Sequence, residues 1–247
     1  MAPLPSPSSP KVALVTGASA GLGKALSLEL TRRGLRVVMV ARNRERLAAS
    51  ADEVRRLGGA EPVALAFDVA DKRAIYPLAG LAAELGGDVD VLIHNASDVG
   101  PVPLRFLLDL ECEDLSSVLE TNVVGPFRLT KAIAGNMVVR GTGTVVFVSS
   151  DAAVSAYPRW GAYGVSKAAA DHLARSLAVE LGDHGIRTFS VDPTDMDTEL
   201  HARAVPGADR RTLARPEDVA RRIADYIFHP ELASNGSRVV AAEGASS

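Results

Sequence analysis

A tyrosine and a lysine stand four residues apart, at Tyr163 and Lys167, inside a stretch that we expect to be helical from Trp160 to Leu181. Side chains at this spacing lie on one face of a helix, about 6 Å apart along its axis. A phenol has an ordinary pKa near ~10, and a neighbouring ammonium group lowers that pKa by favouring the ionised form. The pair could therefore exchange protons near neutral pH. The same pair is common on solvated helices, so the rest of the chain must decide its meaning.

The composition fits a globular protein with a sizeable core. The 247 residues are 47% hydrophobic, which suits one large α/β domain or two small ones. A formal net charge of −3 gives no broad basic field for nucleic acid or an anionic membrane. The single cysteine, Cys112, suits a reducing compartment, so we expect a cytoplasmic location. No stretch approaches the roughly 20 apolar residues that span a bilayer.

Short apolar runs alternate along the chain with amphipathic stretches. We expect strands at 11–15, 36–41, 61–67, 89–94, 144–148, 186–191 and 238–242, with helices between them. This alternation predicts an α/β fold in which a doubly wound parallel sheet carries helices on both faces. We expect residues 11–247 to form one domain, preceded by a flexible tail at residues 1–10, which contain four prolines.

The first expected strand leads directly into a glycine-rich turn, Thr16-Gly17-Ala-Ser-Ala-Gly21-Leu-Gly23, and then into a helix. Glycines let a diphosphate approach the backbone, and the N-terminus of a helix favours negative charge. A glycine cluster can also be a plain turn. The position of this cluster between a strand and a helix favours dinucleotide binding.

The second expected strand ends at Ala41 without the acidic residue that would accept hydrogen bonds from the ribose of NAD. Arg42 follows instead, and its guanidinium group suits a 2′-phosphate. We therefore expect NADPH, although residues 42–46 could simply begin a solvated helix. After the third strand, Asp68 and Val69 could contact the adenine, or Asp68 could only cap a turn.

Three further features point to the carboxyl edge of the sheet. Asn122 and Gly125-Pro126 interrupt an expected helix at 112–139 and predict a kink or break. The fifth strand delivers Ser149-Ser150 to the edge where open α/β folds bind ligands. Residues 194–213, after the sixth strand, are expected to form a mobile lid over the substrate. The five histidines show no ligand spacing, so we expect no metal site.

Taken together and in order, these motifs resemble the short-chain dehydrogenase/reductase family over about residues 11–242. The matching residues are Thr16-Gly17-x-x-x-Gly21-x-Gly23, Asn95-Ala96, Asn122, Ser150 and Tyr163-x-x-x-Lys167. Ser150 precedes Tyr163 by 13 residues and follows Asn122 by 28, as the family pattern expects. The resemblance implies a seven-stranded Rossmann sheet, a nicotinamide cofactor, and a homodimer or homotetramer formed through the long helices.

The resemblance also implies a role for each matching residue. Tyr163 would be the general acid, Lys167 would lower its pKa and hold the nicotinamide ribose, and Ser150 would polarise the substrate oxygen. Asn122 would anchor a water that links Lys167 to solvent. The implied cofactor-binding residues are Gly17, Ser19, Gly21, Leu22, Gly23, Arg42, Asp68, Val69, Asn95, Tyr163, Lys167 and Pro193.

The chain departs from the family pattern at three points. His94-Asn95-Ala96-Ser97 stands where the family has Asn-Asn-Ala-Gly, and Pro193-Thr194 stands where it has Pro-Gly. The last strand lacks the usual Asp-Gly-Gly ending. Ser97 adds a side chain where the backbone of the family lies near the cofactor, and Thr194 alters the wall beside the carboxamide.

These features predict NADPH-dependent reduction of a ketone or aldehyde. An apolar loop at 99–108, with Val99, Val102, Leu104 and Phe106, and Met196 in the lid suggest an apolar or aromatic substrate. An NADP-dependent alcohol dehydrogenase that works mainly in oxidation is an alternative, because the sequence does not decide the direction. A non-catalytic NADP-sensing protein is another, and the intact set of Asn122, Ser150, Tyr163 and Lys167 argues against it.

Overall fold

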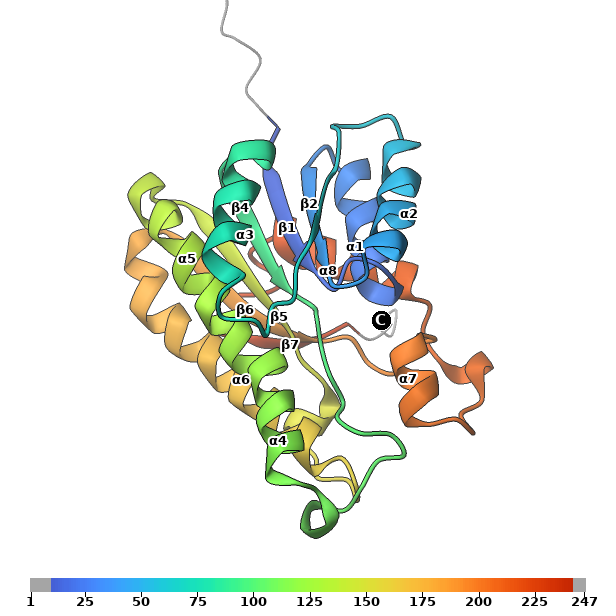
Figure 1. The fold of residues 1–247 in the computed structure, drawn as a ribbon. Coiled ribbons are helices and arrows are strands. Elements are labelled where there is room, and N and C mark those ends of the chain that lie inside the picture. The colour runs from blue at the N-terminus through green and yellow to red at the C-terminus, as the bar shows by residue number, and fades with distance from the viewer. Residues whose placement is uncertain (1–9, 242–247) are drawn as a thin grey trace, which may run out of the picture.

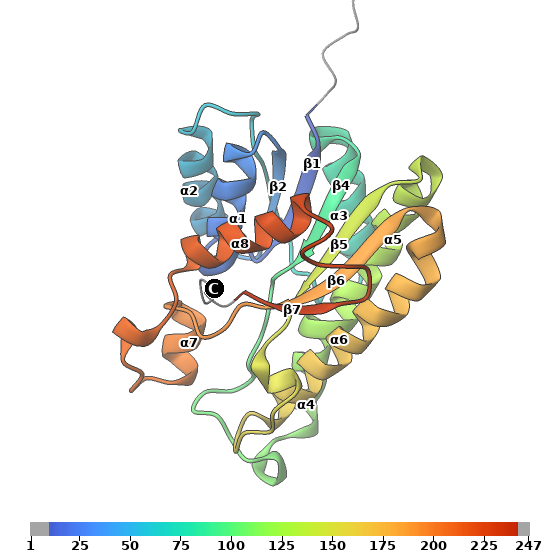
Figure 2. The ribbon, with the colours of Figure 1, turned by 180° about the vertical axis from the view of Figure 1, so that it is seen from behind.

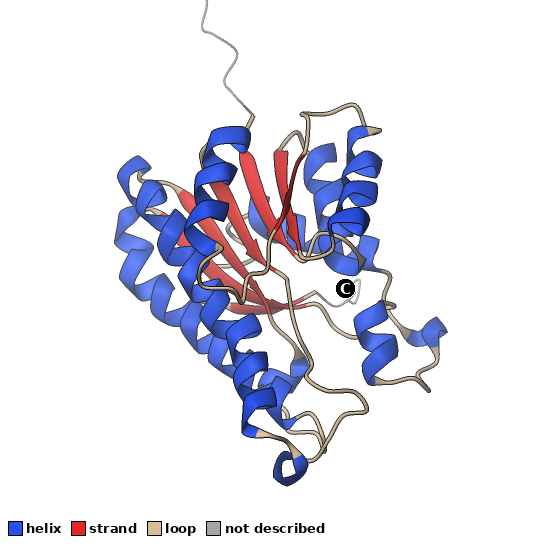
Figure 3. Cartoon of the chain, viewed as in Figure 1, coloured by secondary structure: helices blue, strands red, loops and turns tan. Residues whose placement is uncertain are grey.

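A parallel sheet of seven strands forms the centre of the computed structural model, which describes residues 10–241 (Figures 1 and 3). The strands are β1 (Val12–Thr16), β2 (Arg36–Ala41), β3 (Val63–Ala66), β4 (Val89–His94), β5 (Gly143–Val148), β6 (Ile186–Asp192) and β7 (Arg238–Val240). Their order across the sheet is β3-β2-β1-β4-β5-β6-β7, and each strand runs parallel to its neighbours.

Helices cover both faces of the sheet and bury two hydrophobic clusters (Figure 2). One cluster packs the sheet against α1 (Gly21–Arg32), α2 (Arg44–Arg55) and α8 (Pro216–Phe228). The other packs it against α3 (Ile75–Leu81), α5 (Gly125–Arg140) and α6 (Gly161–Leu181). Side chains alternate along a strand, so Ala13 and Val15 enter the first cluster and Leu14 enters the second. The predicted Rossmann-type, doubly wound α/β fold is confirmed.

The strand order reverses at β1, so that β2 and β3 lie on one side of β1 and β4 to β7 lie on the other. From β1 the chain moves outward through β2 to β3, then returns to β4 on the other side of β1 and continues to β7. At such a switch point the loops after the two neighbouring strands diverge, and ligands bind at the carboxyl edge. In Figure 1 the strand arrows point toward α7 (Glu199–Ala204), which lies beyond this edge.

The helix expected at 112–139 is interrupted, as predicted. It consists of α4 (Cys112–Leu119), a π-helical turn over Glu120–Val124, and α5, which carries Pro126 in its first turn. A proline is tolerated in the first turn because its missing N–H would have no partner within the helix. A second π-helical turn, Ala82–Gly86, follows α3, and short 3₁₀ turns cover Leu107–Asp109, Asp151–Ala153, Gly182–His184 and Arg210–Thr212.

The two ends of the segment expected to be a lid lie side by side. Met196 forms a bridge with Ala214, and the N–H of Asp197 donates to the Ala214 carbonyl at 3.0 Å. Between these residues lie α7 and the 3₁₀ turn. Residues 1–9 of the expected tail and residue 242 of the last expected strand lie outside the described residues. Across 10–241, no helix has both the length and the apolar character needed to cross a bilayer.

The substitution Gly125→Ala tests how the π-helical turn is packed. A Cβ atom at Gly125 would clash with the carbonyl oxygen of Val69, whereas one at Gly135, in the same helix, would meet nothing within 4 Å. We expect Gly125→Ala to destabilise the protein by about 1–3 kcal/mol. Gly135→Ala should stabilise it by up to about 1 kcal/mol, because alanine favours a helix. Chemical denaturation of both variants measures the difference, and equal free energies of unfolding would contradict this packing.

Candidate active site

Three adjoining cavities follow the carboxyl edge of the sheet. The Arg42 cavity, of about 220 Å³, lies beyond β2 and is lined by Arg42, Asp68 and Val69. The central cavity, of about 290 Å³, is lined by the glycine-rich turn, Tyr163 and Lys167. The Trp160 cavity, of about 480 Å³, is lined by Ser150, Trp160 and Tyr163. Gly17 and Ser19 border the first two cavities, and Tyr163 and Pro193 border the last two, so the three form one groove.

The glycine-rich turn lines the central cavity with backbone that carries no side chain at Gly17 and Gly21. Gly17 has a φ of +69°, and a Cβ atom there would lie 2.9 Å from the Cα of Ala96. A Cβ at Gly23 would clash with the carbonyl oxygen of Gly17, so Gly23 lies beneath the turn and does not line the cavity. In the described structure no side chain caps α1 at Ala20, and its first N–H groups are left for another partner. The turn therefore fits the diphosphate of a dinucleotide.

The expected cofactor-binding residues Ser19, Gly21, Leu22, Asn95 and Pro193 all line the central cavity. Asn95 has a second function, because it fastens the end of β4 to the turn after β1. Its Nδ2 donates to the carbonyl of Thr16 at 2.9 Å, and its backbone N–H donates to Thr16 Oγ1 at 3.0 Å. These bonds join two strands that diverge just beyond them.

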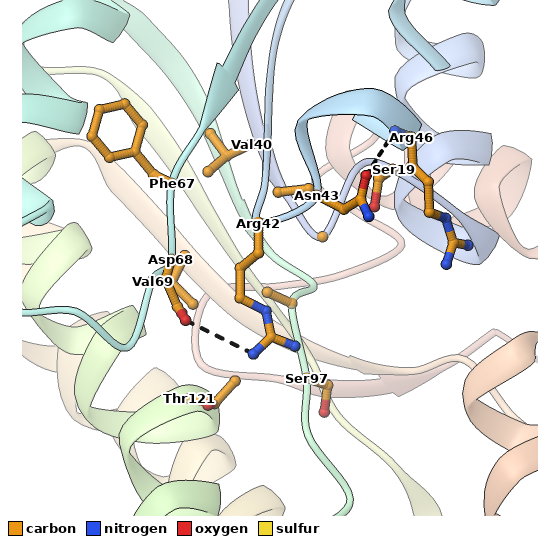
Figure 4. Close-up of a pocket in the computed structure, with 13 residues that line it drawn as sticks. Ser19, Val40, Arg42, Asn43, Arg46, Phe67, Asp68, Val69, Ser97 and Thr121 are labelled. Atoms are coloured by element: carbon orange, nitrogen blue, oxygen red, sulfur yellow. Dashed lines mark hydrogen bonds and ion pairs between the residues drawn. The ribbon is translucent and has the colours of Figure 1, made fainter. Parts of the chain in front are cut away.

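Arg42 and Asp68 face each other across the Arg42 cavity (Figure 4). Arg42 Nη1 lies 3.8 Å from Asp68 Oδ2, and both side chains remain largely exposed. The other carboxylate oxygen, Oδ1, accepts a hydrogen bond from the N–H of Ala70 at 2.9 Å. Asp68 thus caps a turn and lines the cavity at the same time, so the two expectations for this residue do not exclude each other.

Sequence reasoning did not single out Arg46. Its side chain borders both the Arg42 cavity and the central cavity. Its Nη2 lies 2.7 Å from Glu199 Oε1 on α7, and this ion pair joins α2 to the expected lid segment. The one signal in the sequence was the basic run at 42–46, which does not reveal a partner 153 residues away.

Tyr163 and Lys167 lie together on the buried face of α6, as their spacing predicted. The Lys167 Nζ atom is 5.4 Å from the centre of the Tyr163 ring and donates to the carbonyl of Val148 at 2.8 Å. Val148 is the last residue of β5, and Ser150 follows it in the loop. The end of β5 therefore brings Ser150, Tyr163 and Lys167 to the junction of the central and Trp160 cavities.

Burial controls the pKa of both groups. It raises the pKa of Tyr163 to about 12, and the hydroxyl groups of Ser97 and Ser150 oppose this shift. It lowers the pKa of Lys167 to about 8, and the carboxylate of Asp171 opposes that shift. The expectation of a lowered Tyr163 pKa is therefore wrong in its direction. The physical reason is that desolvation disfavours the phenolate more than the neighbouring groups favour it.

Ser150 is held at the start of a 3₁₀ turn. Its Oγ accepts a hydrogen bond from the N–H of Ala152 at 3.2 Å and donates to Asp151 Oδ1 at 3.0 Å. The hydroxyl of Tyr157 donates to the other oxygen of Asp151 at 2.8 Å. Ser150 can therefore turn its hydroxyl toward a substrate only by giving up its bond to Asp151.

Asn122 fastens the loop after β4 to α6 from its position in the π-helical turn. Its Oδ1 accepts from the N–H of Asp98 at 2.7 Å and from Ser97 Oγ at 3.3 Å. Its Nδ2 donates to the Asp98 carbonyl at 2.7 Å and to Ser166 Oγ at 2.9 Å. Asn122 does not line any of the three cavities, so its side chain acts on the site through these neighbours.

Ser97, which stands where the family has glycine, donates a hydrogen bond to Asn122 Oδ1 at 3.3 Å, and its hydroxyl group opposes the rise in the pKa of Tyr163. His94, the other departure in this segment, is structural. Its ring is buried, Nε2 lies 2.7 Å from Thr130 Oγ1, and burial lowers its pKa to about 3. Across residues 10–241, no group of three or more His, Cys, Asp or Glu side chains is placed to hold a metal ion.

The Trp160 cavity has an apolar wall and a polar rim. Its apolar residues are Ala152, Trp160, Met196, Leu200, Val205, Ala208 and Leu213. His201 lies in this cavity beside Asp195, with 3.6 Å between Nε2 and Oδ1. Of the apolar loop residues, Val99 and Leu104 pack around Tyr163. Val102 and Phe106 remain exposed, and neither lines this cavity.

Known proteins share this sequence pattern. Residues 11–208 match the short chain dehydrogenase family. The 7alpha-hydroxysteroid dehydrogenase of Escherichia coli K12 is 32% identical to this chain over 219 residues, which cover 85% of this chain and 84% of that protein.

Solved structures share the fold as well. Actinorhodin polyketide ketoreductase, solved as a variant with NADPH, has a TM-score of 0.86 at 29% identity, covering 94% of this chain and 95% of its own. NAD⁺-bound xylitol dehydrogenase has a TM-score of 0.83 at 27% identity, covering 95% and 98%. The family match spans most of the described chain, and of the residues that line the groove only Asp209, Thr212 and Leu213 lie beyond it. The chain therefore belongs to the short-chain dehydrogenase family of oxidoreductases, which act on hydroxyl or carbonyl groups.

Proposed function

We propose that this protein reduces a ketone or aldehyde to an alcohol with NADPH. The observation that carries the proposal is the position of the Tyr163 side chain. It borders the central cavity and the Trp160 cavity, with Ser150 beside it and Lys167 behind it. A carbonyl carbon held there would lie between the space suited to a nicotinamide and a set of hydrogen-bond donors.

Each residue has one task in this proposal. A bound reduced nicotinamide would supply the hydride. Ser150 donates a hydrogen bond to the carbonyl oxygen and Tyr163 gives that oxygen its proton, so negative charge is stabilised where it develops. Lys167 returns a proton to Tyr163, and a pKa of about 8 leaves the amine able to exchange protons near neutral pH.

The protonated state of Tyr163 suits the first step of a reduction. A general acid must carry its proton when the substrate arrives, whereas a general base must have lost it. Burial raises the pKa of Tyr163 to about 12, so the phenol keeps its proton at neutral pH. An alcohol dehydrogenase that works mainly in oxidation would start from the deprotonated phenol, and it is the second candidate.

Arg42 supports NADPH as the cofactor. Its guanidinium group lies in the Arg42 cavity and has only a distant, exposed carboxylate as a partner, so a 2′-phosphate could replace Asp68 there. Structural relatives use both cofactors, since the actinorhodin ketoreductase was solved with NADPH and the xylitol dehydrogenase with NAD⁺. The chain's own residues at the end of β2 therefore carry this part of the proposal.

The substrate we propose has an apolar or aromatic body. Trp160, Met196 and Leu200 give the Trp160 cavity an apolar wall, which suits such a body. The 7alpha-hydroxysteroid dehydrogenase is named for a substrate of this kind. The segment 194–213 contributes much of that wall, and we propose that it acts as a lid.

We also propose that the protein is a cytoplasmic homo-oligomer. Large apolar side chains are exposed on α5 and α6, at Phe127, Val139, Val165 and Val179. Exposed apolar side chains on these two helices agree with an association of subunits through them. Size-exclusion chromatography with light scattering would separate a dimer or tetramer from a monomer.

Replacing Tyr163 by Phe removes the proton donor and keeps the ring. We expect kcat to fall by at least roughly 100-fold while the Kd for NADPH stays within about two-fold. Turnover is followed by NADPH absorbance with a panel of carbonyl compounds, and binding by calorimetry. Tyr76→Phe, on the exposed surface of α3, is the matched control and should keep full activity. Tight NADPH binding by the unmodified protein without turnover of any carbonyl would instead favour the NADP-sensing alternative.

Replacing Arg42 by Ala tests the choice of cofactor. The variant loses the guanidinium group and leaves Asp68 to repel a phosphate, so we expect NADPH to bind roughly 10- to 100-fold more weakly. NADH binding should change little, because NADH has no 2′-phosphate. Arg44→Ala, two residues along and outside the cavity, is the control. Equal losses for the two cofactors would show that Arg42 does not recognise the phosphate.

Lys167 should make stability depend on pH in a predictable direction. Its pKa falls from 10.5 to about 8 on folding, so between these values the unfolded chain binds more protons than the folded protein. Stability therefore rises with pH across this window, relative to a variant without the amine. Urea unfolding gives the free energy of unfolding of the unmodified protein and of Lys167→Met at pH 7.5 and pH 10. Relative to Lys167→Met, the unmodified protein should be more stable at pH 10 than at pH 7.5. Lys131→Met, at an exposed position of α5, should show no such change.

A further inference from the structure

Arg238, the first residue of β7, has a largely buried guanidinium group that lies next to the candidate active site. Its side chain is 19% exposed, and it contacts two carboxylates that are almost fully buried, Asp171 at 4% and Asp192 at 7%. Nε lies 3.0 Å from Asp171 Oδ2, and Nη2 lies 2.8 Å from Asp192 Oδ2. The same Nη2 donates to the backbone carbonyl of Ser150 at 2.9 Å. Nothing in the family match covers this residue, because the match ends at residue 208.

These contacts connect Arg238 to three parts of the site. Ser150 follows β5 and carries the hydroxyl proposed to hold the substrate oxygen. Asp171 lies on α6, one helical turn beyond Lys167. Asp192 ends β6, and its Oδ1 accepts a hydrogen bond at 2.9 Å from the N–H of Thr194, which has a φ of +62°. That bond supports a left-handed backbone conformation at a position where glycine would be the ordinary choice.

We propose that Arg238 is a positioning residue for this reaction, because it holds the backbone at Ser150 and balances the two buried carboxylates beside Tyr163 and Lys167. The inference rests on the roles proposed for those residues. It differs from an account in which Arg238 only fastens the short strand β7 to β6, where it pairs with Ser190.

The charges around Tyr163 and Lys167 distinguish a positioning role for Arg238 from a purely structural one. Asp171 raises the pKa of Lys167, and Asp192 and Asp151 raise the pKa of Tyr163. The remaining charged side chains of the central cavity, Arg46, Glu199 and Arg203, line it from α2 and α7. Without Arg238, Asp171 and Asp192 would face each other with no cation between them. Both pKa values should then rise, because uncompensated negative charge disfavours the phenolate and favours the ammonium group.

The test measures protonation directly as well as activity. NMR of the protein labelled with ¹³C at lysine reports the pKa of Lys167, with Lys167→Met used to assign its signal. We expect Arg238→Met to raise that pKa by about one unit or more. Asp171→Asn, with Arg238 in place, should lower it. The double variant R238M/D171N should return toward the unmodified protein, a pattern that a purely structural role would not produce.

Activity gives the second readout. In Arg238→Met, kcat for carbonyl reduction should fall roughly 10- to 100-fold through displacement of Ser150, and the pH profile of alcohol oxidation should move to higher pH. If Arg238→Met does not fold, R238M/D171N decides by comparison with Asp171→Asn, because the two differ only in Arg238 and the pKa of Lys167 should be higher in the double variant. Unchanged Lys167 pKa values in the folded variants would overturn the inference. A protein that turns over no carbonyl but shows the pKa pattern would instead refute the proposed function and leave the charge balance intact.

Discussion

Burial of Tyr163 and Lys167 side by side on α6 is the constraint on which the candidate active site depends. Water stabilises charge, so removing a phenol and an amine from it favours the neutral form of each. Burial therefore raises the pKa of the phenol, which keeps its proton at neutral pH, and lowers the pKa of the amine to about 8. A few fixed groups oppose the effect, chiefly Ser97 and Ser150 at the phenol and Asp171 at the amine.

Residues outside the three cavities support the elements that carry these groups. Asn122 joins the loop after β4 to α6, and it can do so because the π-helical turn bulges the chain at that point. Gly125 lets the same turn lie against the backbone at Val69, where any Cβ atom would clash. Arg238 reaches the site from the last strand of the sheet. Helices, loops and the far edge of the sheet thus all fix the position of a small reactive centre.

The departures from the family pattern each have a physical accommodation. Ser97 adds a hydroxyl group that hydrogen-bonds Asn122, where a glycine would leave that contact unmade. Thr194 keeps a left-handed backbone with the help of the Asp192 carboxylate. His94 stays neutral in the core, with its ring packed against Phe147 and bonded to Thr130. Ser97 and His94 are supported by neighbours on other elements, whereas Thr194 is supported by a residue two positions earlier in the chain.

The sequence by itself determined the fold and the residues that gather at the carboxyl edge. Parallel strands all end at one edge, so an ordered set of strands and helices is enough to predict that Gly17, Asn95, Ser150 and Pro193 meet there. It also determined that Tyr163 and Lys167 share a helix face, since that follows from helical spacing alone. Only the tertiary structure decided their protonation and their supporting contacts. A pKa depends on burial and on charges from several elements, and pairs such as Arg238 with Asp171 or Arg46 with Glu199 leave no local pattern in the chain.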